Sequence, residues 1–145
     1  MGTRWLAAFL LGALSLAMAA ELVGVEIGAP APGFDPKDLA TYRIGEAKRV
    51  FGPGDPAVLF VLTWRFQAED VGPLPIELYL IPPRGALVRI AYGLEVRPAW
   101  VGRTIRTFAY LHLTPARIRA QAGTWTVYVL ANGELRGTAR FELRP

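Results

Sequence analysis

The sequence predicts an all-β protein, folded as a single antiparallel β-sandwich of seven to nine strands. Apolar and polar residues alternate over short runs through most of the chain after residue 20. Clusters of Gly, Pro, Asn and Asp separate these runs at intervals of roughly 8–12 residues, which is the spacing expected for a two-layer β fold. A small closed barrel is the alternative that the same pattern permits.

The chain begins with an apolar leader. Arg4 is the only charged residue before Glu21, and the run that starts at Trp5 ends in the small residues Ala19 and Ala20. A positive start, an apolar centre and small residues at the exit predict a secretory signal peptide over residues 1–20. The apolar run is shorter than the about 20 residues of a typical membrane-spanning helix, so retention as a membrane anchor is the weaker alternative. We therefore expect an exported protein, periplasmic or extracellular.

The first part of the mature chain predicts a strand and then a loop. Leu22–Ile27 alternates as a short strand, and the Pro-, Gly- and Asp-rich run Gly28–Asp38 predicts a loop. Residues 21–38 are therefore expected to precede a sandwich domain at residues 39–145. The runs Leu39–Ile44 and Ala47–Phe51 are expected to be extended.

The clearest strand is Ala57–Phe66, which follows the turn cluster Gly52–Pro56. Its even-numbered positions are apolar throughout, and polar residues appear only at Thr63 and Arg65. Because such a run is apolar on nearly both faces, it predicts a central strand.

A hairpin and a long strand follow. Pro75–Ile81 and Ala86–Tyr92 flank the turn Pro82–Gly85, and Gly93–Pro98 is expected to hold a short edge strand. Arg103–Thr114 predicts a long strand, but its pattern does not decide which face is buried.

The C-terminal part predicts a helical turn and a last hairpin. Thr114 is a suitable N-cap for a short helix within Pro115–Ala122. Asn132-Gly133 favours a two-residue type I′ turn. On the strand before this turn, Trp125, Val127 and Val129 are expected to face inward. The last strand then carries the apolar residues Leu135, Ala139, Phe141 and Leu143.

The segment Gly123–Phe141 resembles the last hairpin of immunoglobulin-like and fibronectin type III-like domains of secreted bacterial proteins. The matching features are a Gly-x-Trp-x-Val-x-Val strand from Gly123, the Asn132-Gly133 turn and an inward Phe141. The resemblance implies an immunoglobulin-like sandwich and says nothing about activity, because such folds have many functions. The Cys…Trp…Cys core of antibody-type domains is missing.

Composition excludes several kinds of chemistry. The 145 residues include no Cys and one His, which excludes disulfides, thiolate metal sites and multi-His metal sites. Residues 21–80 hold nine acidic and five basic residues, whereas residues 81–145 hold three acidic and ten basic residues. Catalytic motifs for nucleophilic, zinc and phosphate chemistry are missing. Adjacent carboxylates at Glu69-Asp70 and in the Asp35–Asp38 loop fit solvated loops better than a calcium site. We therefore expect no enzyme, no cofactor and no metal.

One strand suggests a ligand-binding face. If the aliphatic side of Arg103–Thr114 packs inward, its other side presents Arg106, Phe108, Tyr110 and His112 to solvent, with Trp100 and Arg103 nearby. Such a row can stack on a sugar ring while Arg contacts an anion. The simpler interpretation is that the two aromatic rings face the core.

Two functions follow from these observations. The first is a non-catalytic envelope protein that binds another envelope protein through strand edges and the Gly28–Asp38 loop. The second is a module that binds a glycan or polyanion through Trp100, Arg103, Arg106, Phe108, Tyr110 and His112. We expect no sequence-specific nucleic-acid binding, since the net charge after residue 20 is modest.

Overall fold

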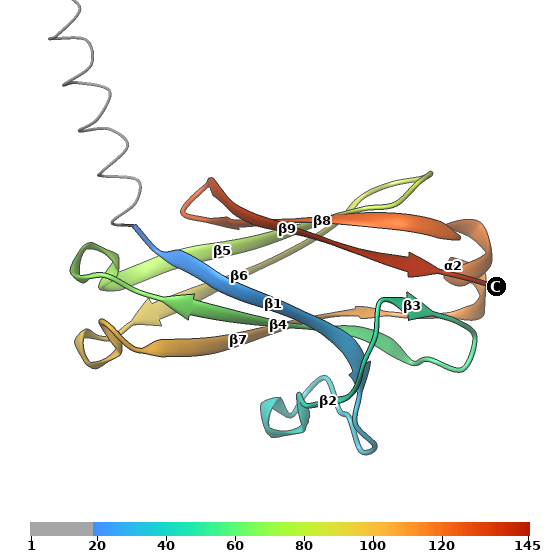
Figure 1. Ribbon diagram of the computed structural model, residues 1–145, viewed down its shortest axis with the longest axis horizontal. Coiled ribbons are helices and arrows are strands. Elements are labelled where there is room, and N and C mark those ends of the chain that lie inside the picture. Colours follow the sequence, from blue (N-terminus) through green and yellow to red (C-terminus); the bar gives the residue numbers. More distant parts are fainter. Residues whose placement is uncertain (1–18) are drawn as a thin grey trace, which may run out of the picture.

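Two β-sheets pack face to face in the computed structural model, which describes residues 19–145 (Figure 1). The four-stranded sheet has the order β2-β1-β4-β7, and the five-stranded sheet has the order β3-β9-β8-β5-β6. The strands of the first sheet are β1 (Glu21–Pro30), β2 (Ile44–Ala47), β4 (Ala57–Arg65) and β7 (Thr104–His112). Those of the second are β3 (Val50–Phe51), β5 (Gly72–Ile81), β6 (Val88–Val96), β8 (Gly123–Ala131) and β9 (Glu134–Leu143).

Every strand pairing is antiparallel except that of the two-residue strand β3 with β9. Short helical turns connect the strands: η1 (Leu39–Thr41), η2 (Ala68–Asp70), η3 (Pro98–Trp100) and α2 (Pro115–Ala120). The β-sandwich prediction is confirmed. By neighbour order, β1, β4 and β7 take the places of strands A, B and E of an immunoglobulin-like sandwich. The strands β5, β6, β8 and β9 take those of C, C′, F and G.

The core lies between the two sheets and is centred on aromatic rings. Phe141 of β9 is 2% exposed, and its ring centroid lies 5.4 Å from Trp125, 5.8 Å from Phe60 and 6.1 Å from Phe51. These contacts join both sheets and the strand β3. Burial of this apolar surface, at about 25 cal/mol per Å², supplies most of the energy that holds the layers together.

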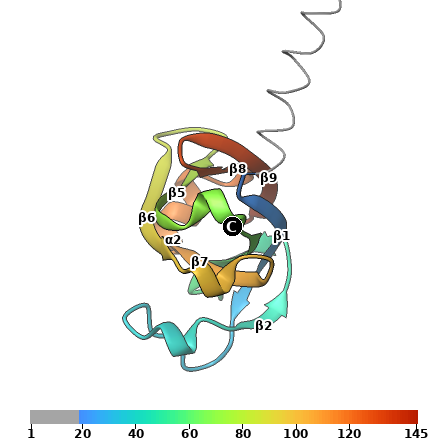
Figure 2. The same ribbon diagram turned by 90° about the vertical axis from the view of Figure 1, so that its left-hand side faces the viewer.

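β4 is the central strand that its sequence predicts, and it is buried on both faces. Val58, Phe60, Leu62 and Trp64 face the five-stranded sheet, while Leu59 and Val61 on the outer face are also buried. On that outer face, Tyr110 and Phe108 of β7 stand opposite Leu59 and Val61. Residues 31–43, which we name the cover segment, lie over this face beside β7 (Figure 2).

The two local predictions near the C-terminus are confirmed. The hydroxyl of Thr114 accepts a hydrogen bond of 3.0 Å from the backbone N–H of Arg117 and caps α2. Asn132 and Gly133 both have positive φ angles, 52° and 76°, as a type I′ turn requires.

Three boundaries differ from the predictions. Of the run Leu39–Ile44 only Ile44 lies in a strand, and Leu39–Thr41 forms the η1 turn. Asp38 caps this turn by accepting a hydrogen bond from the N–H of Ala40. Gly93–Pro98 is not a separate strand, because Gly93 continues the β6 ladder opposite Pro75. Gly28 belongs to β1 and not to the loop. It is buried against β2, and a Cβ atom at this position would lie only 2.5 Å from the backbone oxygen of Glu46 and from the side chain of Ile44.

β1 pairs with both β2 and β4, so Glu21–Pro30 is part of the sandwich rather than a segment that precedes it. The predicted signal peptide lies, for all but its last two residues, outside the described part of the chain. Between residues 19 and 145, none of the helices has the length and apolar character needed to cross a membrane.

Replacing Phe141 by Ala is expected to lower the free energy of unfolding by about 3–5 kcal/mol, because the ring fills the centre of a closely packed core. Leu135→Ala on the same strand is the matched control, since Leu135 is 57% exposed. Its expected effect is below about 0.5 kcal/mol. Urea denaturation of both variants measures the difference. Equal effects would contradict the central place of Phe141 in the core.

Candidate functional site

A groove lies between the edges of the two sheets. Its volume is about 460 Å³. β6 is the last strand of the five-stranded sheet, β7 is the last strand of the four-stranded sheet, and the two lie next to each other (Figure 2). The chain passes from one to the other through η3. We name this hollow the edge groove, and it is lined by Leu39, Tyr42, Tyr92, Leu94, Trp100, Ile105, Arg106, Thr107 and Phe108.

The free edge of β7 forms one wall of the edge groove. The N–H of Leu113 donates to Pro56 O, toward β4, and backbone groups alternate in direction along a strand. The N–H and C=O groups of Arg106, Phe108 and Tyr110 therefore point away from β4, at the free edge. By the same alternation, Ala91 and Gly93 present the free backbone edge of β6. In immunoglobulin constant-type sandwiches a further strand, D, occupies the place beside this edge of strand E.

A short chain of hydrogen bonds fixes the floor of the groove. The indole N–H of Trp64 donates to the hydroxyl of Thr107 at 2.9 Å, and the hydroxyl of Tyr92 lies 2.8 Å from the same oxygen. Burial raises the pKa of Tyr92 to about 12, against a smaller lowering by its hydrogen bond with Thr107. Tyr92 is therefore neutral at physiological pH. Its polar tip is satisfied within the protein, and its ring contributes apolar surface.

Trp100 connects the groove to the core. The ring of Trp64 stacks on Phe66 with centroids 6.2 Å apart, and Phe66 stacks in turn on Trp100 at 6.2 Å. The guanidinium of Arg97 lies over the outer indole at 5.9 Å. This stack holds Trp100 in place, so the groove has a rigid aromatic wall in the unbound protein.

The mouth of the groove is basic. Arg106 lines the groove, and the guanidinium of Arg97 lies over the ring of Trp100. Arg103 lies in the following turn, where its backbone N–H donates to Trp100 O at 3.0 Å. All three residues are exposed. A ligand that combines apolar groups with a negative charge would therefore match both the wall and the rim of this groove.

The six residues predicted as a ligand-binding face do not all lie at one site. Trp100, Arg106 and Phe108 line the edge groove, and Arg103 lies in the turn beside it. Tyr110 and His112 stand further along β7, outside the groove. His112 is exposed, and its carbonyl accepts a hydrogen bond of 3.0 Å from Arg117.

The aromatic side chains of β7 point away from the core, as the ligand-binding prediction requires, but they are not freely exposed to solvent. Ala109 and Leu111 face the core, while Phe108 and Tyr110 are half-buried on the outer face. There the ring centroids of Phe34 and Tyr110 are 5.7 Å apart. The ring centroid of Tyr42 lies 6.0 Å from that of Phe108 and 6.0 Å from that of Tyr110. The rings thus form a second, smaller apolar cluster with the cover segment.

The cover segment is held in place by its own hydrogen bonds. The N–H of Ala31 donates to Arg43 O at 2.8 Å and closes the loop at its base. The hydroxyl of Tyr42 donates to Pro36 O at 2.7 Å, and burial raises the pKa of Tyr42, with smaller contributions from Tyr110 and Asp35. Leu39, 66% exposed, extends from the η1 turn over the groove.

Tyr42, Tyr92 and Leu94 are groove residues that the sequence analysis missed. The alternation that ends at Tyr92 in that analysis continues through Leu94 to Val96, which was the available signal for a longer strand. For Tyr42, the signal was the presence of aromatic residues in and beside a Pro- and Gly-rich loop. Within residues 19–145, no three His, Cys, Asp or Glu side chains lie close enough to hold a metal ion.

The fold and the groove define an immunoglobulin-like sandwich with an open edge on one side. No protein-family model and no curated protein matches the sequence. Among solved structures, the chain is similar to the Pseudomonas fluorescens alkylpurine DNA glycosylase AlkC bound to DNA, with 22% identity and a TM-score of 0.50. That match covers 83% of this chain but only 30% of the glycosylase chain, so the likeness is one of fold over part of a larger protein.

An immunoglobulin-like protein from Pseudomonas aeruginosa is also similar, with 16% identity and a TM-score of 0.47 over 88% of this chain and 99% of that one. The strand order described above, rather than this second likeness, defines the class of fold.

The neutral state of Tyr92 gives a pH-dependent prediction. An unfolded tyrosine loses its proton near pH 10, whereas folded Tyr92 keeps it to about pH 12. The unfolded state therefore binds fewer protons in this range, and the stability that Tyr92 contributes is lost as the pH rises from 10 to 12. Urea denaturation across this range should show a smaller decline for Tyr92→Phe than for the original protein. Tyr128→Phe, at an exposed position of β8, should keep the full decline; an equal decline in all three proteins would contradict the burial of the Tyr92 hydroxyl.

Proposed function

We propose that this chain is a non-catalytic, exported interaction domain that binds an extended segment of a partner protein in the edge groove. The partner segment adds a strand to the free edge of β7 and places its apolar side chains in the groove. The observation that carries the proposal is that the unpaired backbone of Arg106 and Phe108 borders an apolar groove. Exported location rests on the apolar leader of the sequence, and the partner in that compartment is another envelope protein.

Open strand edges are usually protected, because they pair with other chains. β7 has nine residues and contains no Pro, and its free edge has neither a lysine nor a bulge. β-strand addition uses main-chain hydrogen bonds for affinity and pockets for alternate side chains for specificity. The edge groove supplies both, since Tyr92 and Leu94 lie on one side and Tyr42 on the other.

The groove also defines the chemistry of the segment. Its walls are aromatic and aliphatic, so the inward side chains of the partner are apolar at every second position. Arg97, Arg103 and Arg106 at the mouth favour an acidic residue next to this apolar run. The rigid stack of Trp100 lowers the ordering cost of binding on the protein side.

An anionic glycan is the second candidate. Trp100 and Tyr42 offer ring surface in the groove, and Arg106 is placed to contact a carboxylate or sulfate of a sugar. This site differs from the predicted row in its members, because Tyr110 and His112 lie outside it. The DNA bound by the Pseudomonas fluorescens glycosylase is a property of that protein, and a duplex oligonucleotide is a useful control ligand here.

A displayed library of random ten-residue peptides tests the proposal without a known partner. Peptides selected on residues 21–145 should alternate apolar residues and carry at least one acidic residue. Leu94→Gln, which places a polar group in the groove, should weaken the selected peptides at least tenfold, or about 1.4 kcal/mol. Ala91→Gln, on the outward side of the same strand, should leave affinity unchanged. Amide exchange should slow at Arg106, Phe108 and Tyr110 when peptide binds.

Selected peptides that bind Leu94→Gln as well as the original protein would overturn the groove as the binding site. A uronic acid oligosaccharide that binds while no peptide does, with loss of binding in Arg106→Gln, would replace the first candidate by the second. Binding of the duplex oligonucleotide as tight as that of any peptide would overturn both.

A further inference from the structure

On the opposite side of the sandwich, β1 of one sheet passes β9 of the other (Figure 1). Residues of both strands line a second hollow there. Its volume is about 250 Å³, and Arg49 and Arg136 both line it. No acidic residue is among the lining residues. We name it the arginine hollow. Arg49 also borders the two neighbouring depressions on this side, one toward β2 and one along β3.

Glycine residues contribute to the opening of the arginine hollow. Gly24 of β1 and Gly137 of β9 both line it and add no side chain to it. A Cβ atom at Gly137 would approach the side chain of Leu22 to 2.7 Å, so a larger residue there would displace Leu22. The two strands therefore pass closely enough to make one site while leaving space between the arginines.

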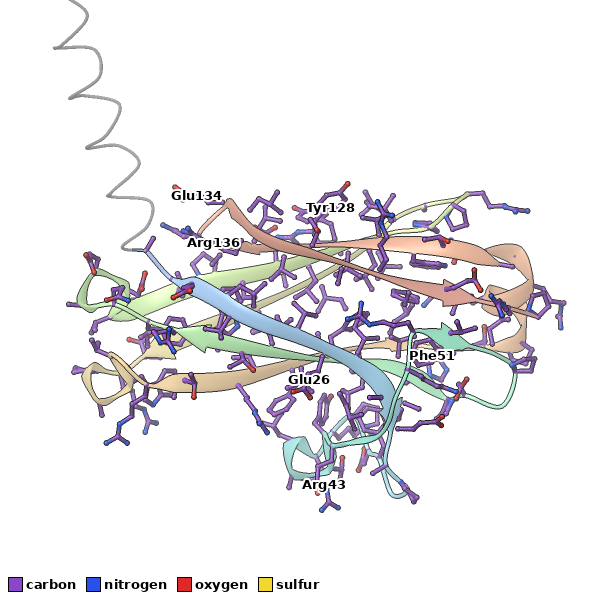
Figure 3. All side chains as sticks on the ribbon, viewed as in Figure 1. Glu26, Arg43, Phe51, Tyr128, Glu134 and Arg136 are labelled. Atoms are coloured by element: carbon purple, nitrogen blue, oxygen red, sulfur yellow. The ribbon has the colours of Figure 1, made fainter. Side chains whose placement is uncertain are left out.

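Arg136 has hydrogen-bonding capacity that the protein does not use. Its side chain is 12% exposed and pairs with Glu134 at 3.1 Å, near the turn that begins β9 (Figure 3). Its Nε–H is buried and has no hydrogen-bond partner among residues 19–145. An unsatisfied buried donor costs about 1–3 kcal/mol, and more for a charged group, so a ligand acceptor at this position would recover that energy.

Backbone donors border the same hollow. β3 covers only the end of β9, where the N–H of Glu142 donates to Arg49 O at 2.7 Å. By alternation, the N–H groups of Arg140 and Thr138 point to the same side, beyond the end of β3. The carbonyl of Arg140 accepts a hydrogen bond of 3.0 Å from the Arg49 guanidinium, which holds that side chain against β9. The N–H of Thr138 remains available at the wall of the hollow.

The two charged residues that line the hollow are both arginines. Arg136 has the partner Glu134, whereas Arg49 has no carboxylate partner among the described ion pairs. Lys48 and Arg144 lie on the same side of the sandwich and are paired with Asp55 and Glu142. A small anion in the hollow would therefore meet one uncompensated guanidinium and the free Nε–H of a second.

We propose that the arginine hollow binds the phosphate group of a ligand. Its donors are two guanidinium groups and one backbone N–H. Arg136 and Thr138 belong to β9, whereas Arg49 lies between β2 and β3, so the acceptor needs oxygens in more than one plane. A single arginine satisfies both oxygens of a carboxylate, whereas a phosphate has additional oxygens for a second arginine and an N–H. The site is independent of the edge groove, since no residue lines both.

Titration with inorganic phosphate tests this site, with sodium chloride of equal ionic strength as the reference. Amide signals of Gly24, Arg136, Gly137 and Thr138 should shift in the nuclear magnetic resonance spectrum, and the melting temperature should rise with phosphate concentration. Arg49→Gln and Arg136→Gln should each weaken phosphate binding at least tenfold. Arg119→Gln, on the exposed side of α2, is the control and should bind as the original protein does.

Dimethyl phosphate and acetate separate the possible sources of the oxyanion. Binding of dimethyl phosphate at the same amides indicates a phosphodiester within a larger molecule, whereas binding of inorganic phosphate alone indicates a free phosphate or a monoester. Acetate that binds as well as phosphate would overturn the assignment to phosphate. Shifts that are equal in sodium chloride, or that persist in Arg49→Gln, would overturn the site. Arg49 is exposed, so its variant keeps the test valid if Arg136→Gln does not fold.

Discussion

The strand β4 is buried on both faces, so both of its sides must be covered by other parts of the chain. Its inner face packs against the five-stranded sheet, and its outer face presents Leu59 and Val61, which are buried as well. A sandwich with only two layers would leave that outer face in water. Removing it from water takes a third layer on one side, and the cover segment lies there. The apolar excess of one strand thus explains why a Pro- and Gly-rich loop folds back onto the sheet.

This third layer partly buries the aromatic residues of β7. Phe108 and Tyr110 point away from the core, yet they pack edge to face with Phe34 and Tyr42. Edge-to-face contacts between such rings stabilise the arrangement by about 0.5–1.5 kcal/mol beyond area burial. The same layer brings Leu39 and Tyr42 to the free edge of β7 and so completes the edge groove. The cover segment thus both buries the outer face of β4 and forms part of the edge groove.

The two sides of the sandwich differ in chemistry because the chain closes them differently. On the β6–β7 side, the chain passes between the sheets through η3 without adding a strand, and an apolar groove remains at the free edge. On the β1–β9 side, β3 adds only two residues to the edge of β9. The arginine hollow, lined by Arg49 and Arg136, lies on this side. The first side suits an extended apolar segment, and the second suits a small anion.

The class of fold and most strand positions could be predicted from the sequence, because they depend on local patterns. The two-sided apolar run of Ala57–Phe66, the Thr114 cap and the Asn132-Gly133 turn each specify structure within a few residues. The contacts between distant segments, by contrast, were set by the tertiary structure. It placed Tyr42 on Phe108, brought Tyr92 to Thr107, and set Arg136 across the hollow from β1. Such contacts depend on which strands become neighbours, and that order is set by packing of the whole core rather than by any short stretch of sequence.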